Sequence, residues 1–303
     1  MRVFVTGATG FIGSAVVPEL IDAGHEVVGL ARSDQAAAAL AAAGVAAHRG
    51  ALDDLDSLRS GAAAADGVIH LAFIHDFSDF ESAARTDLRA VETLGAALEG
   101  SGRPLVIASG TPAIPGRAAT EEDSGDPGSL AGQRIAAAET AIALASRGVR
   151  SSVLRFPRSV HGEGDHGFVP AMIEIARTRG VSAYIGDGSN RWPAVHRLDA
   201  AQLIRRALEA APAGAVLHAV ADEGIPIRDI AELIGRHLDV PVVSISPEAA
   251  ADHFGWLGGV LALDCPASSA LTRERMGWNP VRPGLVADLQ AGHYFDQRRR
   301  AAA

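Results

Sequence analysis

Residues 2 to 13 read Arg-Val-Phe-Val-Thr-Gly-Ala-Thr-Gly-Phe-Ile-Gly, an apolar run followed at once by three glycines at three-residue spacing. The apolar run predicts a buried strand over 2–5, and the apolar positions that follow predict a helix over 11–23. Glycines between them allow a tight turn and let the backbone approach a pyrophosphate closely. The start of the helix would present free N–H groups and a partial positive charge to the phosphates. In this strand–turn–helix setting, the spacing predicts a dinucleotide-binding loop.

The alternation of strand and helix signals continues through the first half of the chain. Further buried strands are expected at 26–30, 45–48, 68–71, 105–108 and 150–154, and helices at 34–43, 55–63, 80–98 and 129–146. Near-continuous apolar strands of this kind imply a parallel sheet with helices on both faces. With right-handed crossovers, the sequence therefore predicts an α/β fold built on a doubly wound parallel sheet, the Rossmann arrangement.

The second half is less regular and predicts a smaller C-terminal substrate-binding region. Its patterns indicate a strand at 215–220 and helices at 168–179, 200–210, 227–237, 247–262 and 268–276. We expect residues 1–157 to form the dinucleotide-binding domain, with 195–225 returning to it, and residues 158–303 to form mainly the substrate domain.

Composition excludes several classes of partner. The 303 residues are 48% hydrophobic and 21% charged, which is ordinary for a globular protein with a sizeable core. The net charge of −9 argues against nucleic acid or an anionic membrane, and no apolar run reaches the ~20 residues that span a bilayer. The single cysteine, Cys265, allows no intrachain disulfide and argues against a cysteine-based metal site. We therefore expect a cytoplasmic protein with a small-molecule substrate and no metal, membrane or nucleic-acid partner.

Three stretches carry a resemblance to a known family. Residues 6–13 read Thr-Gly-Ala-Thr-Gly-Phe-Ile-Gly, residues 154–162 read Leu-Arg-Phe-Pro-Arg-Ser-Val-His-Gly, and residues 276–280 read Met-Gly-Trp-Asn-Pro. Together they resemble the extended branch of the short-chain dehydrogenase/reductase superfamily, the NAD-dependent epimerase/dehydratase-like family, over nearly the whole chain. The resemblance implies a bound nicotinamide dinucleotide and a homodimer formed through the helices at 80–98 and 129–146.

The acid/base pair of that family is missing. Most members use Tyr-x-x-x-Lys, but this chain contains no lysine, so all 27 basic residues are arginine. With Glu139 as the anchor, Ala131 stands at the tyrosine position and Ile135 at the lysine position. The resemblance is therefore to an atypical member that lacks the Tyr-Lys pair. Arg134 is next to the lysine position, but a guanidinium stays protonated and is a poor general base.

The end of the second expected strand indicates which dinucleotide binds. An acidic residue there would bind the ribose 2′-hydroxyl of NAD, but this chain has Leu-Ala-Arg-Ser at 30–33. Arg32 can hold a 2′-phosphate through charge-assisted hydrogen bonds and Ser33 can donate another, so we expect NADP rather than NAD, although Asp34 follows directly. From the glycine loop, this strand end and the resemblance, the expected cofactor-binding residues are Gly7, Thr9, Gly10, Phe11, Ile12, Gly13, Arg32, Ser33, Leu52, Leu71, Ala72, Phe73 and Pro157.

The fifth expected strand ends in Ala-Ser-Gly-Thr at 108–111, where the family has Ser-Ser-Ser/Thr. The resemblance implies that Thr111 polarises the substrate oxygen and that Ser109 lies near the nicotinamide. The alternative is that both hydroxyls only stabilise the turn after the strand. For the missing proton donor the candidates are His75, after the fourth strand, and His161 and His166 further along, because histidine titrates near neutrality. Each could instead be an ordinary solvated or packed loop histidine.

Two residues after the sixth expected strand are candidates for substrate binding. Arg158 could clamp a carboxylate or phosphate, or it could be paired with the acidic loop at 121–123. His161 begins the string His-Gly-Glu-Gly-Asp-His at 161–166 and could reach the substrate. The glycines between these side chains argue against a metal site there.

These patterns predict an NADP(H)-dependent oxidoreductase. The hydride would pass between the nicotinamide and a small carbonyl, alcohol or activated C=C substrate, without a Tyr-Lys acid/base. Reduction of a conjugated double bond needs no strong acid if hydrogen bonds stabilise the enolate. Two alternatives stay open, because a fold does not fix a function: a redox-inactive NADP-binding sensor or scaffold of the NmrA type, and an epimerase or isomerase that retains its nucleotide cofactor.

Overall fold

The computed structural model describes residues 1–75, 79–128 and 132–296. Its centre is a seven-stranded sheet in which all neighbouring strands are parallel, in the order β10-β6-β5-β4-β1-β2-β3. The strands are β1 (Arg2–Thr6), β2 (Glu26–Ala31), β3 (Ala46–Arg49), β4 (Gly67–His70), β5 (Pro104–Gly110), β6 (Arg150–Phe156) and β10 (Ala215–His218). The strand order reverses between β1 and β4, so a crevice for a ligand is expected at their carboxyl ends.

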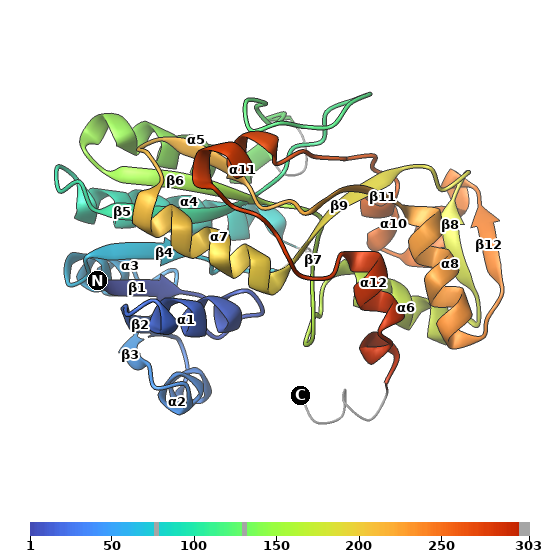
Figure 1. Ribbon diagram of the computed structural model, residues 1–303, viewed down its shortest axis with the longest axis horizontal. Coiled ribbons are helices and arrows are strands. Elements are labelled where there is room, and N and C mark those ends of the chain that lie inside the picture. The colour runs from blue at the N-terminus through green and yellow to red at the C-terminus, as the bar shows by residue number, and fades with distance from the viewer. Residues whose placement is uncertain (76–78, 129–131, 297–303) are drawn as a thin grey trace.

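Helices cover both faces of this sheet (Figure 1). One face is packed by α1 (Gly13–Asp22) and α7 (Arg197–Ala210), and α2 (Asp34–Ala42) adds Leu40 to the same core. The other face is packed by α3 (Leu55–Ala63), α4 (Phe80–Leu98) and α5 (Gly132–Ala143), which continues into a 3-10 turn, Leu144–Arg147. The predicted α/β fold with a doubly wound parallel sheet is therefore confirmed.

A smaller region lies beyond the carboxyl ends of the main strands (Figure 1). It contains a three-stranded sheet, β11-β9-β7, and a parallel pair, β12-β8, packed around the buried Trp192. The strands are β7 (Ser159–His161), β8 (Ser182–Ile185), β9 (Arg191–His196), β11 (Asp222–Pro226) and β12 (Val242–Ile245). The helices are α6 (Phe168–Arg179), α8 (Ile227–Leu238), α9 (Ala250–Phe254), α10 (Leu257–Leu261), α11 (Ala270–Met276) and α12 (Leu285–Gln290), with 3-10 turns at Pro247–Ala249 and His293–Phe295.

The structure differs from the expected elements at a few places. The single helix expected over 247–262 is a 3-10 turn and two short helices, because Gly255, with a φ of 59°, ends α9. The helix expected over 129–146 begins, within the described residues, at Gly132. The chain returns to the main sheet with α7 and β10, between residues 197 and 218, while β9 and β11 on either side belong to the three-stranded sheet. Across the described part of the chain, no helix is both long enough and apolar enough to span a membrane.

Candidate active site

The turn between β1 and α1 needs its glycines. A Cβ on Gly7, whose φ is 72°, would lie 2.7 Å from the backbone nitrogen of Ala72. A Cβ on Gly13 would lie 2.0 Å from the carbonyl oxygen of Gly7. Hydrogen bonds from Gly10 N to Gly7 O (3.0 Å) and from Ser14 N to Gly10 O (2.8 Å) hold the turn closed. Glycine is therefore needed here so that the strand, the turn and the neighbouring loop can lie in backbone contact.

The beginning of α1 fits a diphosphate. Among the described residues, no acceptor receives a hydrogen bond from the backbone N–H groups of Phe11, Ile12 or Gly13. No side chain caps the helix, and its first turn carries no acidic residue. Thr9 and Gly10 are exposed beside these groups. Free amides at a helix N-terminus, with no competing negative charge, form a ready anion site, so the chain's own geometry fits the pyrophosphate of a dinucleotide.

The segment after β4 runs along this loop. The backbone nitrogens of Leu71 and Ala72 donate to the carbonyl and the hydroxyl oxygen of Thr6, each at 3.2 Å. Leu71, Ala72 and Phe73 are all half-buried. These three predicted cofactor-binding residues therefore lie next to the glycine turn, as the sequence order alone could not show. Pro157, the predicted contact of the carboxamide, is buried between β6 and β7.

The end of β2 presents a basic side chain to solvent. Arg32 is exposed and, within the described ranges, has no hydrogen bond or ion pair. The Ser33 hydroxyl accepts a hydrogen bond from Ala36 N (3.2 Å) and caps α2, which leaves its proton able to donate. Asp34 is held by Arg49 at the end of β3 (2.6 Å), a partner that the sequence reasoning did not identify. Leu52 follows β3 and packs half-buried on the core.

A buried hydrogen-bond network lies beneath the carboxyl ends of β1 and β4. His70 is 2% exposed; its Nδ1 lies 2.8 Å from Thr6 Oγ1 and its Nε2 lies 3.1 Å from Asp87 Oδ1. Because a carboxylate only accepts, Nε2 carries the proton and donates to Asp87. With Nε2 as the donor, Nδ1 can accept the hydroxyl proton of Thr6, whose oxygen is already bonded to Ala72 N. His70 is hydrogen-bonded through both ring nitrogens and connects the end of β1, next to the glycine turn, to α4.

Arg134, on α5, extends this hydrogen-bond network. Its Nε lies 3.8 Å from Asp87 Oδ2, its Nη2 donates to the Ala108 carbonyl at 3.2 Å, and its Cζ lies 4.0 Å from the centre of the Phe73 ring. Burial lowers the pKa of Arg134, and the charge of Asp87 opposes that shift. A fixed cation therefore lies between the carboxyl ends of β4 and β5, one residue before the position expected for lysine.

His75 lies at the edge of the same cluster. Its ring is edge-on to Phe73, with centroids 5.3 Å apart, and it is open to solvent on one side. Partial burial and then the charge of Arg134 lower the pKa of His75, with a smaller effect of His166 in the same direction, against a backbone hydrogen bond with Phe73 that raises it. At neutral pH His75 is therefore mainly uncharged, which suits a proton acceptor or a neutral hydrogen-bond donor better than a strong acid.

The hydroxyls of Ser109, near the end of β5, and of Thr111, just after it, have no hydrogen-bond partner among the described residues. Thr111 is 7% exposed, and its Oγ1 is buried without a hydrogen bond to any residue that the structure describes. Its backbone nitrogen donates to Phe156 O at 2.9 Å, which fixes the residue at the end of β6. Ser109 is half-buried, and none of the described residues bonds its hydroxyl. Neither hydroxyl caps the turn, so both are available to a ligand or water.

The two predicted substrate-binding residues are placed differently from expectation. Arg158 is half-buried and contacts the thiol of the buried Cys265, so it is not held by the acidic loop. His161 is fully buried, and its Nδ1 lies 2.8 Å from Asp288 Oδ2. His161 is enclosed in this structure, and its contact with a substrate stays a prediction. The sequence could not reveal this because its partner is 127 residues further along the chain.

Neither tyrosine stands in for the missing acid. Tyr294 is 5% exposed; its hydroxyl donates to Asp165 Oδ2 and accepts from Gly162 N, both at 3.0 Å. Burial, followed by the charge of Asp165, raises the pKa of Tyr294 far above its ordinary value. Tyr184 is on β8 in the second region. Ala131, at the expected tyrosine position, lies outside the described residues, and Ile135 is half-buried on α5.

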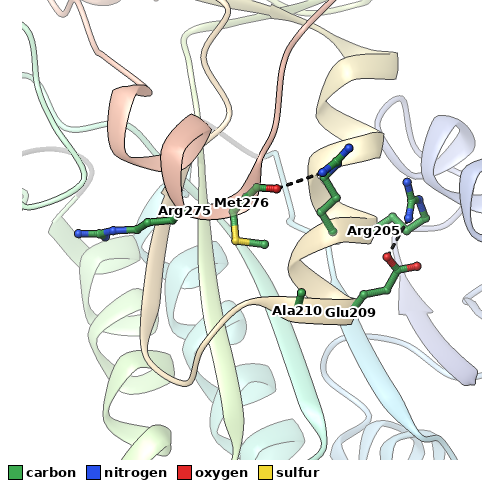
Figure 2. A pocket seen from close by; sticks show the side chains of 6 residues that line it. Arg205, Glu209, Ala210, Arg275 and Met276 are labelled. Atoms are coloured by element: carbon green, nitrogen blue, oxygen red, sulfur yellow. Dashed lines mark hydrogen bonds and ion pairs between the residues drawn. The ribbon is translucent and has the colours of Figure 1, made fainter.

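A surface depression of about 290 Å³ is elsewhere (Figure 2). It lies between α7 and α11, and Arg206 Nη1 bonds the Met276 carbonyl (3.1 Å) while Arg205 Nη1 bonds Glu209 (2.7 Å). None of the predicted site residues lines it, and the candidate site is at the carboxyl ends of β1, β4 and β5. Within the described ranges, no three His, Cys, Asp or Glu side chains are grouped to hold a metal.

Comparison with known proteins agrees with this geometry. The model of the NAD dependent epimerase/dehydratase family matches residues 3–220. The chain belongs to that family. This match confirms the resemblance to extended short-chain dehydrogenases/reductases. These proteins share the fold of a family that contains oxidoreductases and epimerases.

Individual relatives differ in what is known of them. An uncharacterized protein of Schizosaccharomyces pombe is 50% identical over 295 residues, which are 97% of this chain and 100% of the relative. The 2-alkyl-3-oxoalkanoate reductase of Stenotrophomonas maltophilia is 28% identical over 265 residues, 80% of this chain and 77% of the relative. The solved structure of MoeE5 in complex with UDP-glucose and NAD matches with a TM-score of 0.78 and 24% identity over 100% of both chains.

Proposed function

We propose that this protein is an NADP(H)-dependent oxidoreductase acting on a small carbonyl, alcohol or activated C=C substrate. The observation that carries the proposal is the Thr111 hydroxyl, which is buried just after β5 and has no hydrogen-bond partner among the residues that the structure describes. Such a group is costly to bury unless a ligand or water completes its hydrogen bonds. The 28% identical reductase from Stenotrophomonas maltophilia supports a carbonyl substrate.

The cofactor, when bound, supplies or accepts the hydride, and the protein holds it. Gly7, Gly10 and Gly13, with Thr9, Phe11 and Ile12, bind the diphosphate at the beginning of α1. Arg32 and Ser33 bind the 2′-phosphate, and Leu52 packs below the adenosine end. Leu71, Ala72, Phe73 and Pro157 line the path from the diphosphate to the reacting end.

The side chains above that path organise the substrate. Thr111 donates a hydrogen bond to the substrate oxygen and Ser109 lies on the approach to it, so that both stabilise negative charge on an alkoxide or enolate. His75, uncharged at neutral pH, accepts the proton of an alcohol or relays one from solvent. Arg158 contacts Cys265, and its remaining N–H groups bind an anionic group of the substrate.

The absence of a tyrosine and lysine pair favours a second candidate, an NADP-binding sensor without turnover, of the NmrA type. The third candidate is an epimerase or isomerase that retains its cofactor. Calorimetry with NADPH and NADP⁺, followed by a screen of carbonyls, alcohols and enones at the absorbance band of reduced nicotinamide, separates the oxidoreductase from both alternatives. Tight binding without any change of absorbance across the panel would favour the sensor or the cofactor-retaining epimerase.

The decisive variant is Thr111→Val, which removes the hydroxyl and keeps the shape of the side chain. We expect kcat to fall by about a hundredfold or more, the usual effect of losing one donor to a developing oxyanion. Thr86→Val is the matched control, because the Thr86 hydroxyl donates to the Ser82 carbonyl on the same helix, α4. Turnover that survives Thr111→Val unchanged would remove the proposed role of this hydroxyl.

A further inference from the structure

The 2′-phosphate end of the proposed cofactor site contains a charge that sequence reasoning leaves unresolved. Asp34 follows Arg32 and Ser33 directly, and its side chain is 98% exposed at the beginning of α2. A free carboxylate in this place would repel a 2′-phosphate and would offer acceptor oxygens to the ribose hydroxyls of NAD. By itself, Asp34 would therefore weaken the preference that Arg32 creates.

The neighbouring strand supplies a counter-charge. Arg49 ends β3, directly opposite Ala31 in the parallel register, and the backbone of Gly50 donates to Ala31 O at 3.2 Å. This pairing places Arg49 beside the turn that carries Arg32. Arg49 Nη2 lies 2.6 Å from Asp34 Oδ1, so one carboxylate oxygen is bonded to Arg49, whereas the exposed Arg32 has no partner among the described residues.

We propose that Arg49 is a second specificity-determining residue, which selects NADP(H) over NAD(H) by occupying Asp34 and by joining Arg32 at the 2′-phosphate. The inference rests on the proposed function, because it assumes that a dinucleotide binds at this turn. An ion pair as exposed as Arg49–Asp34 is weak, because water screens both charges. A 2′-phosphate carries more negative charge than a carboxylate, so it can compete with Asp34 for the guanidinium of Arg49.

The test compares dissociation constants for NADPH and NADH by calorimetry at one fixed ionic strength, because exposed charges are screened by salt. Arg49→Ala should raise the NADPH dissociation constant about tenfold, as expected for one lost charge-assisted contact, and leave that for NADH unchanged or lower. In the Arg49→Ala, Asp34→Asn double variant the NADPH affinity should recover in part, because the freed carboxylate is then gone.

The control is Arg59→Ala. Arg59 on α3 pairs with Asp56, and the exposed fractions of that pair, 58% and 91%, are close to the 57% and 98% of Arg49 and Asp34. This variant should change neither dissociation constant. Unchanged circular dichroism and melting temperature in all variants would show that the fold is intact.

The outcomes separate the two proposals. A wild-type protein that prefers NADPH, with the same NADPH-to-NADH ratio in Arg49→Ala, would overturn the role of Arg49 and leave the proposed function standing. A wild-type protein that prefers NADH, or binds neither dinucleotide, would overturn both. A changed ratio in Arg49→Ala without any recovery in the double variant would refute the part played by Asp34 and keep only direct contact of Arg49 with the phosphate.

Discussion

Asp87 and Arg134 place opposite charges 3.8 Å apart beneath the carboxyl ends of β4 and β5. The Asp87 side chain is 3% exposed and that of Arg134 is 22% exposed, so the pair is shielded from water on most sides. Through His70 the carboxylate is also connected to Thr6, next to the glycine turn. A single polar network thus supports both the glycine turn and the end of β5 near the candidate hydroxyls.

Removal of the carboxylate should destabilise the whole fold. In Asp87→Ala the guanidinium of Arg134 loses its counter-charge and His70 loses its acceptor, so we expect the free energy of unfolding to fall by about 3 kcal/mol. Urea denaturation followed by circular dichroism measures the change. The control is Glu81→Ala, which removes an exposed partner of Arg85 on the same helix and should have no measurable effect. Equal losses in the two variants would contradict a supporting role for the buried network.

The glycine turn gives a prediction about binding. An added methyl at Gly13 would lie 2.0 Å from Gly7 O, a distance that forces α1 away from β1. Gly13→Ala should therefore abolish detectable NADPH binding in calorimetry and lower the melting temperature. Gly259→Ala is a suitable control, because a Cβ there meets no atom within 4 Å. If Gly13→Ala binds NADPH as tightly as the wild type, the turn is not the diphosphate site.

His218 makes stability depend on pH. It is fully buried on β10; Nδ1 lies 2.8 Å from Ser268 O and Nε2 lies 3.5 Å from Arg155 Nη1. Burial, aided by the charge of Arg155, lowers the pKa of His218 below its ordinary value of 6.5, although the bond to Ser268 and the charges of Glu121 and Asp123 oppose this. The unfolded chain then takes up a proton at a higher pH than the folded one.

The direction in which protonation of His218 changes the free energy of unfolding can be tested. Stability should be independent of His218 above about pH 6.5 and should fall as pH drops below it, because protonation of the unfolded state is favoured there. Urea unfolding across this range, for wild type and for His218→Gln, measures the slope. In the variant, the slope of the free energy of unfolding against pH should decrease by up to the contribution of one proton. The contributions of His75, His196 and His253, whose pKa values are also lowered, should remain. An identical slope in both proteins would mean that His218 titrates normally.

How far the sequence could predict this molecule depends on the range of each interaction. The glycine turn, Arg32 and the alternation of strands and helices are local patterns, and the fold they predict is confirmed. The pairs of Asp34 with Arg49, His161 with Asp288, and Arg158 with Cys265 join residues brought together only by packing. No local spacing encodes them, and they decide which predicted polar side chains can meet a ligand.

A substitution of Tyr294 tests whether this tyrosine replaces the missing catalytic acid. Its hydroxyl bridges Gly162 N and Asp165, and so ties the 3-10 turn at His293–Phe295 to the loop that carries His166. In Tyr294→Phe these partners lose a buried hydrogen bond each, and we expect a loss of about 1–3 kcal/mol in the free energy of unfolding. NADPH affinity should stay unchanged, and so should kcat on any substrate found in the screen, because the hydroxyl is enclosed and holds its proton tightly. A large fall in kcat with stability intact would instead identify Tyr294 as the proton donor, and the roles proposed for Thr111 and His75 would have to be reassigned.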